Sequence, residues 1–226
     1  MLAIDQIEWT SKMERSIQST AENSLTKAFA LEEEKVAELV DLIRTPNLSK
    51  ADMRTLESLI VTDVHSRDTT AEIMQLNVRD IASFEWISQL RHYTAMEDNA
   101  RIKSEPKLEI KISMINSTRN YGFEYQGSQT RLVITPLTDR CYRTLMGALQ
   151  LNLGGAPEGP AGTGKTETTK DLAKALAKQC LVFNCSDQID VATMGKFFKG
   201  LACCGAWACF DEFNRIELEV LSVIAQ

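Results

Sequence analysis

Apolar residues recur every three or four positions through most of the first hundred residues. This spacing predicts amphipathic helices, with polar breaks between them, over residues 5–17, 22–43, about 50–76 and about 83–96. The run Thr45-Pro46-Asn47 marks a turn, and Ser49 precedes Asp52 by three residues in a helix-capping pattern. No residue cluster here has the spacing of a nucleophile, an acid–base pair or a metal site, so we expect these helices to form an interaction surface.

Alternating apolar and polar residues replace the helical spacing over residues 107–114. Leu108, Ile110, Ile112 and Met114 would lie on one side of a strand, which could form a hairpin with residues 122–125. We therefore expect residues 1–130 to form a mainly helical segment with a terminal hairpin, and residues 131–226 to form a different domain.

Residues 166–226 alternate between helical and strand patterns. Residues 166–179 and 191–200 have helical spacing, residues 180–184 are typical of a strand, and the apolar run 201–210 is typical of a strand buried on both faces of a parallel sheet. A short strand is also expected at residues 154–158, although Pro157 cannot donate to a strand ladder. The predicted fold class is α/β, an incomplete parallel sheet with helices on both faces.

A complete G-x-x-x-x-G-K-[ST] motif is the strongest chemical signal in the chain. Its glycines let backbone N–H groups turn inward around phosphate oxygens at the N-terminus of the following helix, as in P-loop NTPases. Lys165 would reach the β- and γ-phosphates of ATP, and the Thr166 hydroxyl would bind Mg²⁺. The predicted nucleotide contacts are Gly159, Pro160, Ala161, Gly162, Thr163, Gly164, Lys165 and Thr166.

An acidic pair, Asp211-Glu212, follows the apolar run. Ligands of parallel α/β sheets lie beyond the carboxyl ends of the strands, where this run would place both carboxylates. Asp211 would hold Mg²⁺ directly or through water, and Glu212 would polarise the attacking water as general base. Asn184 ends the preceding strand. It could hold Glu212 in an unproductive rotamer, or it could simply be a turn-forming residue.

Composition narrows the class of protein. The net charge of −6 at pH 7 argues against nucleic-acid binding. No stretch has the pattern of a signal peptide or the length of a membrane helix, so we expect a cytosolic chain. The six cysteines include no C-x-x-C pair, which favours buried, reduced thiols over zinc or disulfides. His65 and His92 lack metal-ligand spacing and are expected to pack or to lie at the surface.

Four motifs, in order, closely resemble the first AAA+ module of dynein heavy chains, of axonemal rather than cytoplasmic type. They are Ile134–Tyr142, Gly159–Thr168, Phe183–Asp187 and Phe210–Arg215. Earlier residues are similar to the end of the dynein linker, namely Phe84–Arg91, and Tyr121–Tyr125 leading into Arg131–Val133. The resemblance covers about residues 60–226, and more loosely the helical start.

The resemblance implies a minus-end-directed microtubule motor of the cilium axoneme, an ATPase in which ATP at this site drives a swing of the linker. Residues 1–130 would be linker-like, and residues 131–226 would be the N-terminal part of an AAA+ ATPase module. Val133, Ile134 and Pro136 match the stretch that packs on adenine. The implied partners are microtubules, reached through other parts of the parent protein, dynein intermediate and light chains, and the other AAA+ modules of the ring.

The sequence stops at Gln226, soon after the acidic pair. We therefore expect a truncated module without the later strands, the sensor residues and the neighbouring arginine finger, and hence a weak or inactive ATPase in isolation. The alternative is a truncated, non-catalytic fragment that binds nucleotide or dynein subunits without motor activity. A separate AAA+ remodelling or nucleic-acid ATPase is disfavoured by the linker-like segment and the acidic charge.

Overall fold

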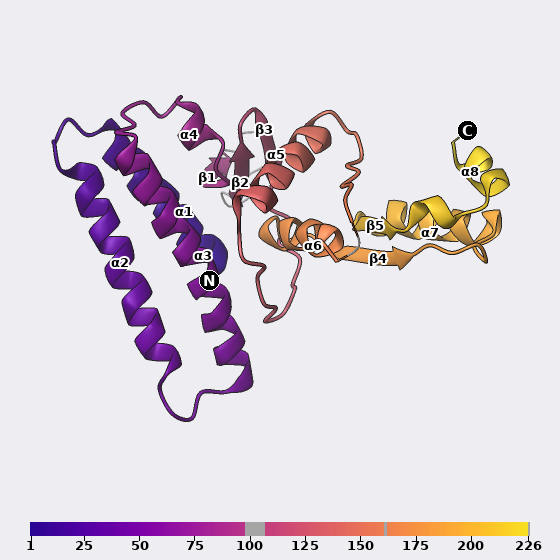
Figure 1. Cartoon of the computed structure of the whole chain (residues 1–226), viewed down its shortest axis with the longest axis horizontal. Helices are drawn as coiled ribbons and strands as arrows, with labels where there is room; N and C mark the ends of the chain where they lie inside the picture. The colour runs from indigo at the N-terminus through magenta and orange to yellow at the C-terminus, as the bar shows by residue number, and fades with distance from the viewer. Residues whose placement is uncertain (98–106, 161, 226) are drawn as a thin grey trace. The chain divides into compact units, whose positions relative to one another are not determined.

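The computed structural model describes residues 1–97, 107–160 and 162–225 (Figure 1). The chain divides into two compact units. The first contains Met1–Tyr121 and Gly127–Pro157, and the second contains Gly122–Gln126 and Glu158–Gln226. The chain therefore passes from one unit to the other three times. None of the described helices is both long and apolar enough to cross a bilayer.

Three long helices open the first unit: α1 (Leu2–Gln18), α2 (Ser24–Ile43) and α3 (Lys50–Gln75). They confirm the first three predicted helices, and Figure 1 shows them lying side by side. The predicted cap is also confirmed, because the Ser49 hydroxyl accepts a hydrogen bond from the Asp52 backbone N–H at 3.1 Å.

The apolar core of this unit is centred on two tryptophans. Trp86 belongs to the short helix α4 (Phe84–Ile87), is fully buried, and has its ring centroid 5.4 Å from that of Trp9 on α1. Met13, Ile17 and Ile73 complete the buried surface around them. This cluster fixes α4 against α1 and α3, since large aromatic side chains bury most of the apolar area in such a core.

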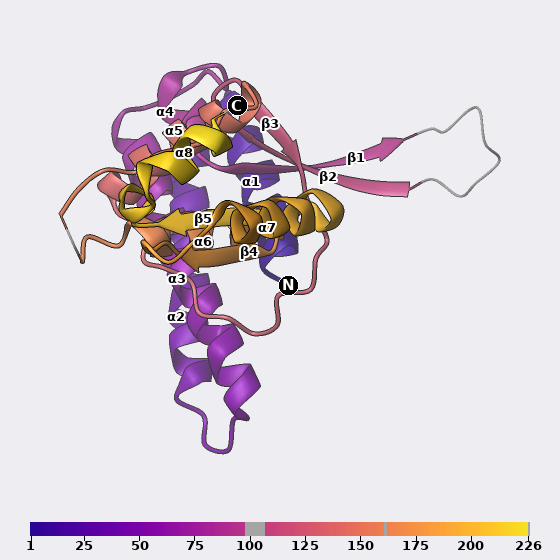
Figure 2. The ribbon, with the colours of Figure 1, turned by 90° about the vertical axis from the view of Figure 1, so that its right-hand side faces the viewer.

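A three-stranded antiparallel sheet follows, in the order β1 (Arg91–Glu97), β2 (Lys107–Met114), β3 (Ser117–Asn120). It confirms the strand predicted at 107–114 but shows that two other predictions were wrong. The helix expected over 83–96 ends at Ile87, because the residues after it pair with β2 as a strand instead. The hairpin partner of β2 is β3, not residues 122–125, since the chain turns back directly after Met114. Figure 2 shows β1 and β2 extending side by side as a ribbon.

The helix α5 (Pro136–Gln150) was not predicted from the sequence. It begins with a capping box, in which Thr135 accepts from the Thr138 backbone N–H and Thr138 accepts from the Thr135 backbone N–H. Pro136 fits the first turn because its missing N–H needs no partner there. The Ser117 hydroxyl of β3 donates to the Met146 carbonyl at 2.8 Å, which ties the sheet to this helix.

The second unit alternates helices and strands. Its elements are α6 (Lys165–Ala175), β4 (Cys180–Asn184), α7 (Val191–Cys204), β5 (Trp207–Asp211), a 3-10 turn η1 (Phe213–Arg215) and α8 (Leu218–Ile224). The strands β4 and β5 pair in parallel, with Phe183 opposite Phe210 and Asn184 opposite Asp211. The mixed α/β class and the parallel sheet expected from the sequence are thus present.

Helices cover both faces of this two-stranded sheet. Phe183 and Phe210 lie on the face that contacts α7, where Phe183 meets Phe197 at a ring-centroid distance of 4.6 Å. Asp211 follows Phe210 and therefore lies on the opposite face, where it contacts Thr166 of α6. The alternation of side chains thus places the phosphate-loop helix on the Asp211 face.

Two strand predictions were wrong, one in its starting residue and one in its existence. Residues 201–204 continue α7, which ends when Gly205 adopts a left-handed conformation with φ of 68°. The strand β5 is consequently shorter than predicted, and its residues are half-buried rather than buried. Residues 154–158 form no strand, since Pro157 removes a ladder donor and the two glycines before it favour no extended pairing.

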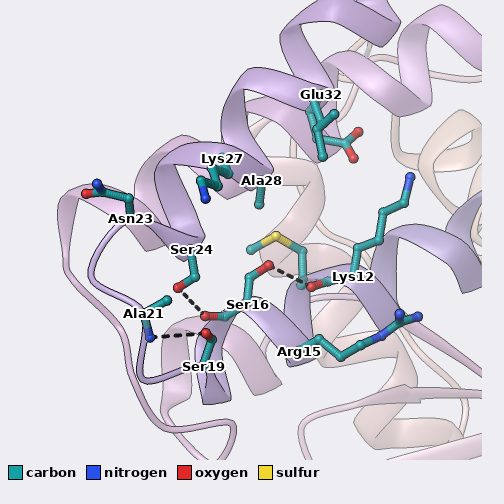
Figure 3. A pocket seen from close by; sticks show the side chains of 12 residues that line it. Lys12, Arg15, Ser16, Ser19, Ala21, Asn23, Ser24, Lys27, Ala28 and Glu32 are labelled. Carbon is teal, nitrogen blue, oxygen red and sulfur yellow. Dashed lines mark hydrogen bonds between the residues drawn. The ribbon is translucent and has the colours of Figure 1, made fainter.

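A cavity of about 430 Å³ lies between α1 and the start of α2. Figure 3 shows Lys12, Arg15 and Lys27 around it, with Glu32 entering from α2. Burial raises the pKa of the Glu32 carboxyl, although the positive charge of Lys35 opposes this shift. The cavity therefore joins a basic rim to a buried carboxyl group with a raised pKa.

A buried charged cluster links the three long helices. The Lys35 ammonium of α2 contacts the carboxylates of Asp5 on α1 and Asp63 on α3, the latter at 3.1 Å. Asp63 is completely buried, and burial together with the hydrogen bond to Asp5 raises its pKa to about 7. One ammonium group thus neutralises two carboxylates only in part. A proton on Asp63 removes the repulsion between the Asp5 and Asp63 carboxylates.

We predict that Asp63→Asn stabilises the chain more at pH 8 than at pH 5.5. Because the folded pKa of Asp63 is raised, the folded state holds a proton that the unfolded chain releases. The stability contributed by this proton is present below the unfolded pKa near 3.8 and is lost as pH rises through about 7. Asparagine resembles the protonated acid and removes this loss. The measurement is the urea midpoint from the fluorescence of Trp9 and Trp86, in a Trp207→Phe background.

Comparing the variant with the parent at each pH isolates Asp63. His65, whose pKa is lowered by burial to about 4, is present in both proteins and cancels in the comparison. The exposed Glu57→Gln on the same helix serves as the control for loss of a carboxylate. An equal difference between variant and parent at both pH values would rule out a raised Asp63 pKa.

Candidate functional site

The loop before α6 is shaped by two glycines. Gly162 and Gly164 have φ of 77° and 80°, left-handed conformations that residues with a side chain rarely adopt. Gly164 is the N-cap of α6, and its carbonyl accepts from the Thr168 backbone N–H at 2.9 Å. The loop therefore leads directly into a helix N-terminus, where the helix dipole and free N–H groups favour an anion. Ala161, one of the predicted contacts, lies outside the described residues.

The Lys165 side chain folds back over this loop. Its ammonium donates to the carbonyl oxygens of Gly159 and Pro160, each at 2.8 Å. The Thr163 hydroxyl donates to the same Pro160 carbonyl at 2.9 Å. The loop carbonyls thus hold the positive charge next to the helix N-terminus, where a phosphate oxygen could replace them as its partner.

The start of α6 and the end of β5 meet at Thr166 and Asp211. The Thr166 hydroxyl lies 2.6 Å from Oδ1 and 2.8 Å from Oδ2 of the Asp211 carboxylate. Both residues are half-buried. A hydroxyl and a carboxylate are ligands that Mg²⁺ accepts, and the two are far apart in sequence but adjacent in space. The residues present fit the predicted magnesium position, while their role as ligands stays a prediction.

Glu212 has a partner that the sequence did not predict. It has φ of 54°, and its exposed carboxylate forms an ion pair with Arg215, Nε to Oε2 at 2.6 Å. Asn184 ends β4 opposite Asp211 and is exposed at the same strand end. Sequence reasoning considered Asn184 as the partner of Glu212 and missed Arg215. The spacing of three residues between opposite charges is the signal that could have identified this pair.

Cysteines near the site remain protonated. Burial, followed by the negative charge of Asp211, raises the pKa of the Cys209 thiol to about 11, and the same causes raise the pKa of Cys185. All six cysteines are free thiols. Cys203 and Cys204 are exposed, contrary to the predicted burial, because residues 201–204 belong to α7 rather than to a strand. Thiolate chemistry therefore has no basis at Cys209 or Cys185.

The residues predicted to contact adenine lie in the first unit. Val133 is exposed, Ile134 is half-buried, and Pro136 begins α5. The phosphate loop, Thr166, Asp211 and Glu212 all lie in the second unit. The structure thus gathers the residues predicted to bind phosphate and magnesium into one site, and their roles, like the adenine contacts, stay predictions.

Comparison with known proteins identifies the family. Residues 121–226 match a family described as the hydrolytic ATP binding site of the dynein motor region. The whole chain is 56% identical to human dynein axonemal heavy chain 3 and 55% identical to human dynein axonemal heavy chain 12, covering 5% and 7% of their lengths. It is also 52% identical over 221 residues to mouse dynein axonemal heavy chain 1, which is 98% of the chain and 5% of that protein.

The chain thus spans less than a tenth of the length of these relatives. Its full-length similarity to them and the match of its second half to a dynein ATP-binding region agree with the resemblance seen in the motifs. The chain therefore belongs to the dynein heavy chain family, and the relatives named above are axonemal members of that family.

Proposed function

We propose that the parent protein binds and hydrolyses ATP at this site as part of a dynein-type, minus-end-directed microtubule motor. One observation carries the proposal: the Thr166 hydroxyl and the Asp211 carboxylate converge within 2.8 Å at the helix N-terminus that also positions Lys165. A phosphate loop, a lysine and a strand-end acid in this arrangement suit phosphoryl transfer, which depends mainly on positioning and charge. The family described for residues 121–226 supports the same reading.

The chain's own residues divide the work of binding. Backbone N–H groups of the loop from Gly159 to Gly164 would surround the phosphates, and Lys165 would exchange its loop carbonyls for β- and γ-phosphate oxygens. Thr166 and Asp211 would hold Mg²⁺, which neutralises negative charge on the phosphates when bound. The convergence of these two oxygen ligands is the feature of the structure that favours such a cation.

Glu212 would orient the attacking water and accept its proton. It must first leave Arg215, and this costs little because exposed ion pairs in water are weak. Asn184, at the same strand end, could hold the carboxylate in a second position. In this proposal the base alternates between partners, and the bound nucleotide favours the productive one.

The wider assignment follows the family. Residues 1–130 would be the end of the linker, residues 131–226 would be the first part of an AAA+ module, and ATP would drive the linker to swing. Val133, Ile134 and Pro136 would pack on adenine. Microtubules, dynein intermediate and light chains and the other AAA+ modules would be the partners, and the axoneme of cilia the location. The axonemal relatives support the microtubule and dynein partners and the axonemal location.

We predict that two substitutions in the parent protein separate binding from hydrolysis. Lys165→Ala should abolish binding of a fluorescent ATP analogue, since the loop loses its only side-chain cation for the phosphates. Glu212→Gln should keep binding but slow turnover by about two orders of magnitude or more, the usual contribution of a positioned base. Steady-state ATP hydrolysis and equilibrium binding are the two measurements.

The exposed Glu219→Gln, on α8, is the control for loss of a carboxylate in the same unit. Turnover that stays normal in Glu212→Gln would exclude this residue as the base. Binding without any turnover in the unaltered parent would favour nucleotide binding without catalysis at this site.

We also predict that ATP changes the distance between the linker and the ring in the full-length Glu212→Gln protein. A swing needs two arrangements, and ATP shifts their balance only through its different affinity for each. Fluorophores on residues 1–130 and on the ring would report this change as energy transfer. An unchanged distance between the nucleotide-free and ATP-bound forms would leave residues 1–130 as a static docking surface.

A further inference from the structure

A five-residue segment, Gly122–Gln126, is separated by sequence from the rest of the second unit but belongs to it. Its backbone bonds to the end of the phosphate-loop helix: Gly122 N–H donates to the Leu176 carbonyl at 2.8 Å, and Glu124 N–H donates to the Ala177 carbonyl at 3.1 Å. We call residues 122–126 the clasp. The sequence pattern suggested a hairpin strand here, and the resemblance placed Tyr121–Tyr125 at the end of the linker.

The Glu124 carboxylate adds two further bonds at the same place. It accepts from the Gln179 backbone N–H at 2.6 Å and pairs with the Lys178 ammonium at 3.0 Å. These bonds lower the pKa of Glu124, with the Gln179 N–H as the largest cause. A carboxylate held by both a backbone N–H and an ammonium forms strong, charge-assisted hydrogen bonds.

The helix end that the clasp holds is itself unusual. Lys178 N–H donates to the Ala173 carbonyl and Ala177 N–H to the Lys174 carbonyl, the bonding of a Schellman motif. Such a motif favours glycine at its left-handed position, yet here that residue is Ala177, with φ of 49°. Leu176 and Ala177 are buried, and their carbonyls find partners in the clasp. The clasp therefore stabilises a conformation that alanine would otherwise leave.

The close approach of the Gly122 backbone to the end of α6 explains why this clasp residue is glycine. A Cβ on Gly122 would lie 2.4 Å from the Ala177 carbonyl oxygen, and a backbone atom cannot rotate away as a side chain can. Gly122 has no positive φ that would require glycine. It is the space beside α6, rather than the backbone conformation, that excludes larger residues here.

The opposite end of α6 is the phosphate loop. The helix runs from Lys165 to Ala175, 11 residues or about 16 Å, and its middle residues Leu172 and Ala173 are fully buried. A buried helix moves as one body, so a shift at its start appears at its end. One element thus connects the nucleotide site to the clasp.

On both sides of the clasp the chain is bonded within the first unit. Tyr121 N–H donates to the Ile110 carbonyl at 2.8 Å, and the Ser58 hydroxyl of α3 donates to the Gln129 carbonyl at 2.7 Å. Consecutive residues, Tyr121 and Gly122, therefore bond to different units, with no slack between them. The residues that flank the clasp are therefore both bonded within the first unit.

We propose that the clasp is the positioning element through which the state of the phosphate loop reaches the first unit, with Gly122 and Glu124 as the residues that make the connection. The proposal rests on the proposed function, since it needs a nucleotide at Lys165. It is more specific, because it places the coupling at the C-terminal end of α6.

The first test follows amide hydrogen exchange in the full-length Glu212→Gln protein. ATP should change the exchange rate of the peptide covering residues 119–127 by about fivefold or more, the lower range for coupled sites. Lys165→Ala should abolish this change. Exchange that is the same with and without ATP, in protein shown to bind ATP, would overturn the proposal and make the clasp a static helix cap.

The second test separates coupling from nucleotide affinity. Gly122→Ala and Glu124→Gln leave every phosphate-loop residue in place, so each is compared with the parent at a concentration of fluorescent ATP analogue that saturates it, because coupling is reciprocal and the affinity itself can change. Each should reduce the ATP-dependent change in linker-to-ring energy transfer by about half or more. If Gly122→Ala fails to fold, Glu124→Gln carries the test, because it removes the charge and keeps the size.

Two matched controls lie in the same unit. Gly200→Ala adds a methyl group to α7 where no atom lies within 4 Å, and Glu219→Gln removes an exposed carboxylate. Both should behave as the parent. Full energy-transfer changes in both clasp variants would overturn the proposal. If Lys165→Ala also leaves nucleotide binding and the energy-transfer change intact, the proposed function fails. If Lys165→Ala loses both while the clasp variants behave as the parent, only the proposed role of the clasp is wrong.

Discussion

The hydrogen bonds between the Thr166 hydroxyl and the Asp211 carboxylate join the two halves of the candidate site. They tie the first turn of α6 to the last residue of β5, although the two residues are 45 positions apart. The parallel pairing of β4 and β5 fixes where Asp211 emerges, and the left-handed Gly164 fixes where α6 begins. Without this meeting point, the phosphate loop and the acidic pair would be separate motifs.

Helix α6 has a proposed role at each end. At its N-terminus, the absent side chains of Gly162 and Gly164 leave backbone N–H groups available to an anion. At its C-terminus, the Leu176 and Ala177 carbonyls are satisfied by a segment from much earlier in the chain. Helix ends leave backbone groups without intrahelical partners, which suits the proposed ligand at one end and the bonds to the clasp at the other.

The first unit shows a different balance of forces. Its tryptophan core supplies apolar burial, whereas Lys35 holds two carboxylates between helices at a position that is costly to desolvate. Because Asp63 titrates near neutral pH, the attraction between α2 and α3 depends on its proton. The helices are thus joined by one interaction that is insensitive to pH and one that responds to it.

Local patterns were sufficient where the physics is local. The helical spacing of residues 5–17, the Ser49 cap and the glycines of the phosphate loop each act through neighbouring residues, so the sequence alone determined these elements and the chemistry of the loop. Alternation likewise identified β2, because side chains on a strand point to opposite faces in turn. The family resemblance, also carried by short motifs, agrees with the comparisons.

Tertiary structure decided the rest. The residues after Ile87 became a strand because β2 offers a partner, and the apolar run 201–210 divided at Gly205 because one half packs as helix and the other pairs with β4. Arg215 holds Glu212, and the clasp holds Ala177, through contacts that no periodicity reveals. A sequence pattern records which residues prefer burial, but only the folded chain determines which backbone and side-chain groups become partners across long separations.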